Sequence, residues 1–192
     1  MRLHAHKLFP TAVMEVENFL ESHETAEIHE HLMHWDSDKQ HDAILNDGTS
    51  SHGSDENIIE SVGIADRVQT ALNFYTNIDG RKRLKATDSW YSIQNKGSVL
   101  KQHTHSGSIA SAVIYINTPE GSNKLYFNNP NPLVEYTNER VVYSNEYNYE
   151  WYSFNAVAGT MIIFPSWLSH GSYYHENQSE NRTIISLNTR YE

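Results

Sequence analysis

From Asp88 onwards, the chain is a succession of short aromatic and β-branched runs separated by turn residues. Runs of this kind predict β-strands. The expected strands cover 89–95, 98–104, 109–117, 123–128, 140–144, 149–155, 160–164, 171–175 and 182–190. Strands of this number and spacing suit a jelly roll, in which two antiparallel sheets face each other across one core. The second half of the chain therefore predicts a mainly β fold.

The first half is organised differently, because helix signals dominate it. After a short strand over 8–16, Ser22 offers an N-cap for a helix over 22–34. A polar stretch over 36–56 predicts a mobile surface loop. The apolar pattern over 58–75 predicts a second helix that covers a sheet. The fold expected from both halves is a mainly β fold with flanking helices.

Length and composition narrow the setting. We expect one domain over 1–192, with a helical cover at about 17–80 and a jelly-roll core at about 88–190. A net charge of -10 with 14 Lys and Arg residues disfavours binding to a nucleic-acid backbone, which needs clustered cations. The absence of cysteine excludes disulfides, cysteine-ligated zinc, iron–sulfur clusters and thiol catalysis.

No segment of the sequence predicts membrane association or secretion. No run approaches the roughly 18 apolar residues of a membrane span, and the N-terminus lacks the apolar stretch of a signal peptide. We therefore expect a cytoplasmic protein without membrane or nucleic-acid partners. In that setting, the sequons that begin at Asn177 and Asn181 are chance matches.

Three histidines form the candidate metal centre. His103 and His105 flank Thr104, and in a strand two such residues point to the same face. His170 follows the predicted strand over 160–164 and a turn, so a third imidazole could join the first two. Three nitrogen ligands that leave coordination positions open are typical of a mononuclear metal that binds substrate or oxygen. The alternative is a pair of polar side chains on an exposed strand.

Arg182 is the candidate anion clamp, because it opens the final predicted strand twelve positions after His170. A planar guanidinium binds a carboxylate through two parallel hydrogen bonds. The alternative is an arginine paired with a structural Asp or Glu.

Other sequence features are weaker candidates for a functional site. The helical zinc-protease pattern fails because Met33 stands four residues after His29. The aromatic run over 143–154 could line a substrate channel, although strand packing explains it as well. We expect the remaining histidines to lie on the surface, among them His4, His6, His23, His41 and His52.

These motifs resemble those of the 2-oxoglutarate and Fe(II)-dependent oxygenases. The closest subgroup is found in bacteria and their phages and is distantly similar to prolyl hydroxylases. The resemblance spans 90–188 and also includes 8–11. The segments that carry it are His103-Thr104-His105, Ser111-Ala112-Val113-Ile114-Tyr115-Ile116, Phe164-Pro165-Ser166-Trp167-Leu168-Ser169-His170 and Arg182-Thr183-Ile184-Ile185-Ser186-Leu187-Asn188.

The resemblance implies a cupin-like double-stranded β-helix that holds Fe(II) through a His-x-Asp/Glu motif and a distal histidine. By position, His103 is the first ligand, His170 is the distal ligand, and Arg182 grips the far carboxylate of 2-oxoglutarate. The Tyr115 hydroxyl is expected to form a hydrogen bond with this cosubstrate. The sequence departs from the family at His105, which stands where the carboxylate is usual. We retain His105 as a ligand, with water or a carboxylate from elsewhere as the alternative.

The implied activity is that of a dioxygenase, an oxidoreductase that converts 2-oxoglutarate and O₂ to succinate and CO₂ while it hydroxylates a substrate. Ascorbate could support such turnover. The substrate could be a small molecule or a protein side chain, and the oligomeric state stays open, with a homodimer among the options. Two other functions stay open as well. One is an inactive jelly-roll binding or structural module, and the other is a three-histidine metal oxygenase that does not use 2-oxoglutarate. The stretches 36–56 and 128–132 are the expected rims of the entrance.

Overall fold

Antiparallel strands make up most of the computed structural model, which describes residues 1–35, 44–131, 133, 141–172 and 175–192. The helices are α1 (Ser22–Met33), α2 (Ile58–Ser61) and α3 (Ala65–Asp79). The strands are β1 (Met14–Val16), β2 (Ile44–Leu45), β3 (Gly48–Ser50), β4 (Leu84–Gln94), β5 (Val99–Leu100), β6 (Ala110–Asn117), β7 (Leu125–Asn128), β8 (Trp151–Phe154), β9 (Met161–Pro165), β10 (His170–Gly171) and β11 (Arg182–Tyr191).

The large sheet has the strand order β1-β9-β6-β11-β4-β3. Its long central strand β11 pairs antiparallel with β4 on one side and with β6 on the other. A smaller sheet has the order β10-β7-β8, and β2 pairs with β5. Side chains of the large sheet and the small sheet meet in a buried apolar cluster. This arrangement confirms the mainly β, jelly-roll fold.

Side chains along β6 alternate between the two faces of the large sheet, and the two faces pack against different clusters. Ala112, Ile114 and Ile116 join the apolar cluster beneath the helices. Val113 and Tyr115 instead join the cluster between the sheets. Successive residues of a strand point to opposite faces, so β6 can be buried on both sides. One face is therefore committed to packing, and the other is available for the site.

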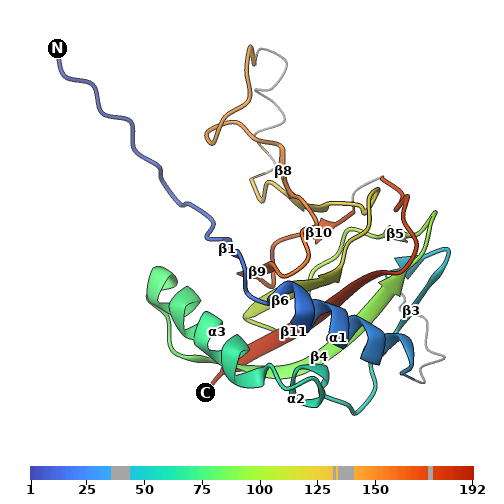
Figure 1. Ribbon diagram of the computed structural model, residues 1–192. Helices are drawn as coiled ribbons and strands as arrows, with labels where there is room; N and C mark the ends of the chain where they lie inside the picture. The colour runs from blue at the N-terminus through green and yellow to red at the C-terminus, as the bar shows by residue number, and fades with distance from the viewer. Residues whose placement is uncertain (36–43, 132, 134–140, 173–174) are drawn as a thin grey trace.

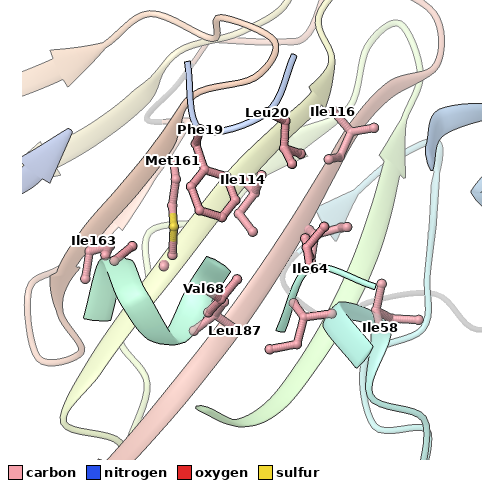
Figure 2. Close-up of a cluster of buried hydrophobic side chains, with 14 of the residues drawn as sticks. Phe19, Leu20, Ile58, Ile64, Val68, Ile114, Ile116, Met161, Ile163 and Leu187 are labelled. Carbon is pink, nitrogen blue, oxygen red and sulfur yellow. The ribbon is translucent and has the colours of Figure 1, made fainter. Parts of the chain in front are cut away.

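The helices lie against one face of the large sheet (Figure 1). The buried helix residues Ile58 and Val68 share one apolar cluster with the sheet residues Ile114 and Leu187. Ile64, which lies between α2 and α3, belongs to the same cluster. Figure 2 shows these side chains pointing into the space between helices and strands. None of the helices in the described ranges is long and apolar enough to cross a bilayer.

Several expected boundaries differ from the structure. The helix expected over 58–75 is two helices, because the chain turns at Gly63, where φ is +73°. The helix over 22–34 is confirmed as α1, although Glu21 rather than Ser22 is its N-cap. In α1, the backbone N–H of Glu21 donates to the Glu24 carboxylate at 2.8 Å.

The prediction of a loop over 36–56 was wrong in part, because β2 and β3 lie within it. Residues 36–43 lie outside the described residues. The strand expected over 140–144 is not formed at 141–144, which are turn and irregular residues. The strand expected over 8–16 is limited to β1.

Candidate metal centre and anion pocket

The backbone brings His103 and His170 together directly. The N–H of His103 donates to the carbonyl of His170 at 2.9 Å, and the N–H of His170 donates back to the carbonyl of His103 at 3.0 Å. Gly171 permits this approach, since a Cβ at this position would lie 2.7 Å from the carbonyl oxygen of Leu100 and 2.8 Å from that of Lys101. The chain segment after β5 can therefore run close beside β10, and the two imidazoles start from adjacent positions.

The three imidazoles converge on one point. The Nε2 atoms of His105 and His170 are 3.2 Å apart. The ring of His103 lies 4.4 Å from that of His170 and 5.0 Å from that of His105, between centroids. One nitrogen of each ring lies within 4.8 Å of the corresponding nitrogen of the other two. A single ion could contact all three atoms, because metal–nitrogen bonds are about 2.0–2.1 Å long.

Hydrogen bonds at the back of two rings fix which nitrogen faces the centre. The Nδ1 atom of His103 lies 2.8 Å from the carbonyl oxygen of Lys101, and that of His170 lies 2.8 Å from the carbonyl oxygen of Leu168. A carbonyl oxygen only accepts, so each Nδ1 carries the hydrogen. Each Nε2 then presents a lone pair to the centre, which is the tautomer that metal binding requires.

Burial keeps these imidazoles neutral. It lowers the pKa of His170 to about 3. Burial also lowers the pKa of His103, and the nearby His52 acts in the same direction. A protonated imidazole cannot coordinate a metal, so both effects favour the form that binds.

His105 reaches the centre by a route different from the one that the sequence predicts. Residues 104 and 105 are not in a strand. Instead the backbone N–H of His105 donates to the carbonyl of Ser166 at 2.9 Å, which ties the residue to the end of β9. The indole of Trp90 lies 5.8 Å from its ring, between centroids. The expected proximity of His103 and His105 is present, although His105 is held by the residue that follows β9 and not by a strand of its own.

Arg182 lies in the same cavity, with 4% of its surface exposed. Its Nη1 donates to Oε1 of Gln94 at 3.0 Å, and its guanidinium lies 5.6 Å from the centroid of the Tyr115 ring. Its Nε has no hydrogen-bond partner. Among the described residues no carboxylate pairs with it, so the alternative of a structural ion pair finds no support there.

Two polar groups beside Arg182 also lack hydrogen-bond partners. The hydroxyl of Tyr115 is buried without a hydrogen-bond partner, and so is Nε2 of Gln94. Burial raises the pKa of Tyr115 to about 12, so the phenol keeps its hydrogen and can donate it. Burial also lowers the pKa of Arg182. Buried donors without acceptors are costly, and several in one cavity predict an anionic acceptor there.

One cavity therefore contains all five residues that the sequence singled out, namely His103, His105, Tyr115, His170 and Arg182. No Asp or Glu of the described chain lines it, so a carboxylate that would replace His105 is absent from this lining. A three-histidine group is the metal-ligand cluster that the described residues offer. His29, the first residue of the zinc-protease pattern, is not part of this group, and its Nδ1 lies 3.1 Å from the Thr183 hydroxyl.

Sequence reasoning missed Gln94, Trp90 and His52. Gln94 stands directly opposite Arg182 in the β4–β11 register, which cannot be known before the strands are paired. His52 is exposed, as expected, but its ring lies 4.8 Å from that of Trp90 beside the metal centre.

The sequence also led to expectations for Asn177, His41 and the stretch that ends at Pro132. Asn177 is fully buried and its amide donates to three backbone carbonyls, so it is a structural residue. His41 and Pro132 lie outside the described residues.

Comparisons with known proteins agree with this geometry. A family model described as "Putative 2OG-Fe(II) oxygenase" matches residues 88–188, which include all five site residues. The match covers more than half of the chain. No curated protein matches it significantly.

Solved structures are similar in fold. HygX from Streptomyces hygroscopicus, solved with nickel and 2-oxoglutarate bound, has a TM-score of 0.64 at 12% identity, over 94% of this chain and 83% of that one. A prolyl-4-hydroxylase from Pseudomonas putida has a TM-score of 0.60 at 13% identity, over 95% and 94%. The viral collagen prolyl hydroxylase of Paramecium bursaria Chlorella virus-1, in a 2-oxoglutarate complex, has a TM-score of 0.55 at 13% identity, over 94% and 96%. At this level of identity, the similarity is one of fold.

Proposed function

The chain belongs to the 2-oxoglutarate- and Fe(II)-dependent oxygenases, and we propose that His103, His105 and His170 bind its iron. The observation that supports this best is the convergence of three imidazole nitrogens within 4.8 Å of one another. The Nδ1 hydrogen bonds of His103 and His170 orient the rings without consuming the metal-binding nitrogens. The set leaves coordination positions open for the cosubstrate and O₂.

Arg182 is the proposed partner of the far carboxylate of 2-oxoglutarate. Its unpaired Nε and its Nη groups offer the fork that a carboxylate accepts. Gln94 holds one side of this fork at 3.0 Å. Tyr115 supplies a further donor, because its buried hydroxyl has no other partner. A dicarboxylate that spans the cavity would join the metal centre to this clamp.

The activity is that of an oxidoreductase that couples the oxidative decarboxylation of 2-oxoglutarate to the oxidation of a second substrate. The bound iron supplies the O₂ chemistry. The residues of this chain supply the rest. They orient the cosubstrate between Arg182 and the histidines, and the buried side chains of Tyr115 and Arg182 line the far end of the cavity.

His105 changes the charge of the proposed centre. Three neutral imidazoles leave a divalent metal with its full charge, whereas a carboxylate ligand would remove one unit. The inactive binding module and the oxygenase without 2-oxoglutarate remain the competing functions. The oxygenase without 2-oxoglutarate leaves unexplained why Arg182 and Tyr115 keep buried donors without an acceptor in the same cavity.

We further propose that the substrate is a small molecule or a protein side chain, handled in the cytoplasm, and that the reaction is a hydroxylation. Relatives of similar fold support this class of substrate. One was solved with hygromycin B, and another with a peptide fragment of hypoxia inducible factor. The net charge of -10 continues to disfavour a nucleic-acid substrate.

Succinate release tests this function directly. The purified protein should convert 2-oxoglutarate slowly to succinate in the presence of Fe(II), ascorbate and O₂, even before its substrate is known. His105→Asp should retain the metal and raise this rate, because it restores the usual ligand charge, and His170→Ala should abolish the rate. If the parent protein binds metal and 2-oxoglutarate but never releases succinate, the inactive module is the correct reading.

A further inference from the structure

His105 differs from the other two histidines of the cluster in what holds it. His103 and His170 hold each other through a pair of backbone hydrogen bonds. His105 lies outside any strand, and its backbone N–H is bound to the carbonyl of Ser166 at 2.9 Å. The position of His105 therefore depends on the position of Ser166.

Ser166 is the first residue after β9 and is fully buried. Its N–H donates to the carbonyl of Ile109 at 3.1 Å, and its hydroxyl lies 2.8 Å from the hydroxyl of Ser111. Ser111 in turn donates to Oδ1 of Asn188 at 2.8 Å. Ser111, Ser166 and Asn188 each come from a different one of the motif segments that the family resemblance rests on.

The direction of the hydrogen bonds in this chain can be assigned. Nδ2 of Asn188 lies 2.9 Å from a carboxylate oxygen of Asp88, which accepts only. Oδ1 of Asn188 is therefore the acceptor that faces Ser111, and Ser111 uses its hydrogen there. It follows that Ser166 donates to Ser111. Each group has one role, so the chain from Ser166 to Asp88 specifies a single arrangement.

We propose that the buried chain formed by Ser166, Ser111 and Asn188 positions His105 for metal binding. The proposal rests on the proposed function, in which His105 is a ligand. Ser166 is a positioning residue, because its side chain fixes the orientation of the backbone carbonyl that holds His105. If Ser166 lacks its hydroxyl, Ser111 loses a donor inside the fold. The turn after Pro165 then loses its side-chain link to β6 and, through Ser111, to β11.

Calorimetric titration of Ni(II) into the metal-free protein at neutral pH tests the proposal. Ser166→Ala should weaken Ni(II) binding about tenfold, in the range seen when groups that orient metal ligands are removed. His105→Ala should weaken it at least as much. The double variant should bind no more weakly than His105→Ala alone, because Ser166 acts through His105. Ser111→Ala should reproduce the Ser166 effect and serves as the second variant if Ser166→Ala does not fold.

Ser89→Ala is the matched control. Ser89 is also buried, accepts from the N–H of Ile59 at 3.0 Å and donates to Asn57, away from the cavity. The Ser89→Ala variant should have a lower thermal unfolding temperature than the parent and the same Ni(II) affinity. Three results would each overturn the positioning role. Ser166→Ala could bind Ni(II) as tightly as the parent, or Ser89→Ala could lose as much Ni(II) affinity as Ser166→Ala. The double variant could also lose the product of the two single-variant losses in Ni(II) affinity. If His105→Ala itself binds Ni(II) as tightly as the parent, the ligand assignment fails, and the positioning role fails with it.

Discussion

At the residue scale, Arg182 decides whether the cavity is built for a dicarboxylate. Arg182→Met should weaken 2-oxoglutarate binding roughly ten- to hundredfold, because charge-assisted hydrogen bonds contribute about 1.5–3 kcal/mol. Arg182→Lys should recover part of the loss, since an ammonium keeps the charge but not the fork. Calorimetry with the Mn(II) form in the absence of O₂ measures both. The metal affinity of each variant is the control. Unchanged 2-oxoglutarate affinity in Arg182→Met would mean that Arg182 has a structural role only.

Single residues could be predicted from the sequence where the chemistry of the side chain was local. The sequence singled out the three histidines and Arg182, which line one cavity, because each stands in a motif with a chemical reason for its residue type. Gln94 could not be predicted in this way. The role of a glutamine depends on the residue opposite it, and the register of β4 and β11 determines that partner. His52 is similar, since its neighbour Trp90 is distant in sequence.

At the element scale, Gly171 lets β10 approach the segment that carries His103. Gly171→Ala should destabilise the fold by about 1–3 kcal/mol, because its Cβ would lie 2.7 Å from a backbone oxygen that cannot rotate away. It should also weaken Ni(II) binding, because His103 and His170 would be forced apart. Urea unfolding and Ni(II) titration check the two effects separately.

Gly159→Ala is the control for that substitution. Gly159 has a φ of +81°, and a Cβ there would lie 2.4 Å from the carbonyl oxygen of Leu20, next to α1 rather than the histidines. This variant should be destabilised while its folded fraction keeps the parent affinity for Ni(II). If Gly171→Ala binds Ni(II) as tightly as Gly159→Ala, close packing at Gly171 has no bearing on the metal centre.

Elements were predicted well where the apolar pattern was long and poorly where short segments depended on partners. The strands over 109–117 and 182–190 are present as β6 and β11, whose runs are buried almost throughout. The strand over 98–104 was expected as one unit. It is β5 followed by a single bridge at His103, because those residues meet different neighbours. β3 was missed because Gly48–Ser50 gains its strand geometry only by pairing with β4.

At the scale of the whole molecule, the buried imidazoles tie folding to pH. An unfolded histidine has a pKa of about 6.5, whereas burial lowers the pKa of His170 to about 3 in the folded protein. Between these values the unfolded chain binds a proton that the folded chain does not. The free energy of unfolding of the metal-free protein should therefore fall as the pH drops below about 6.5, by up to about 1.4 kcal/mol per pH unit for this one group.

The pH interval for measurement follows from the other groups. Arg67 lowers the pKa of the Glu24 carboxyl to about 2, so the loss of that ion pair adds to acid destabilisation below the usual carboxylate pKa of about 4.3. Urea unfolding between about pH 7 and pH 5 isolates the histidine effect. His170→Asn, which cannot titrate, should flatten the slope there, and saturating Ni(II) should raise the stability of the parent at every pH in that interval because the ion binds only the folded state. An equally steep slope in His170→Asn would mean that the acid sensitivity of this fold does not arise from His170.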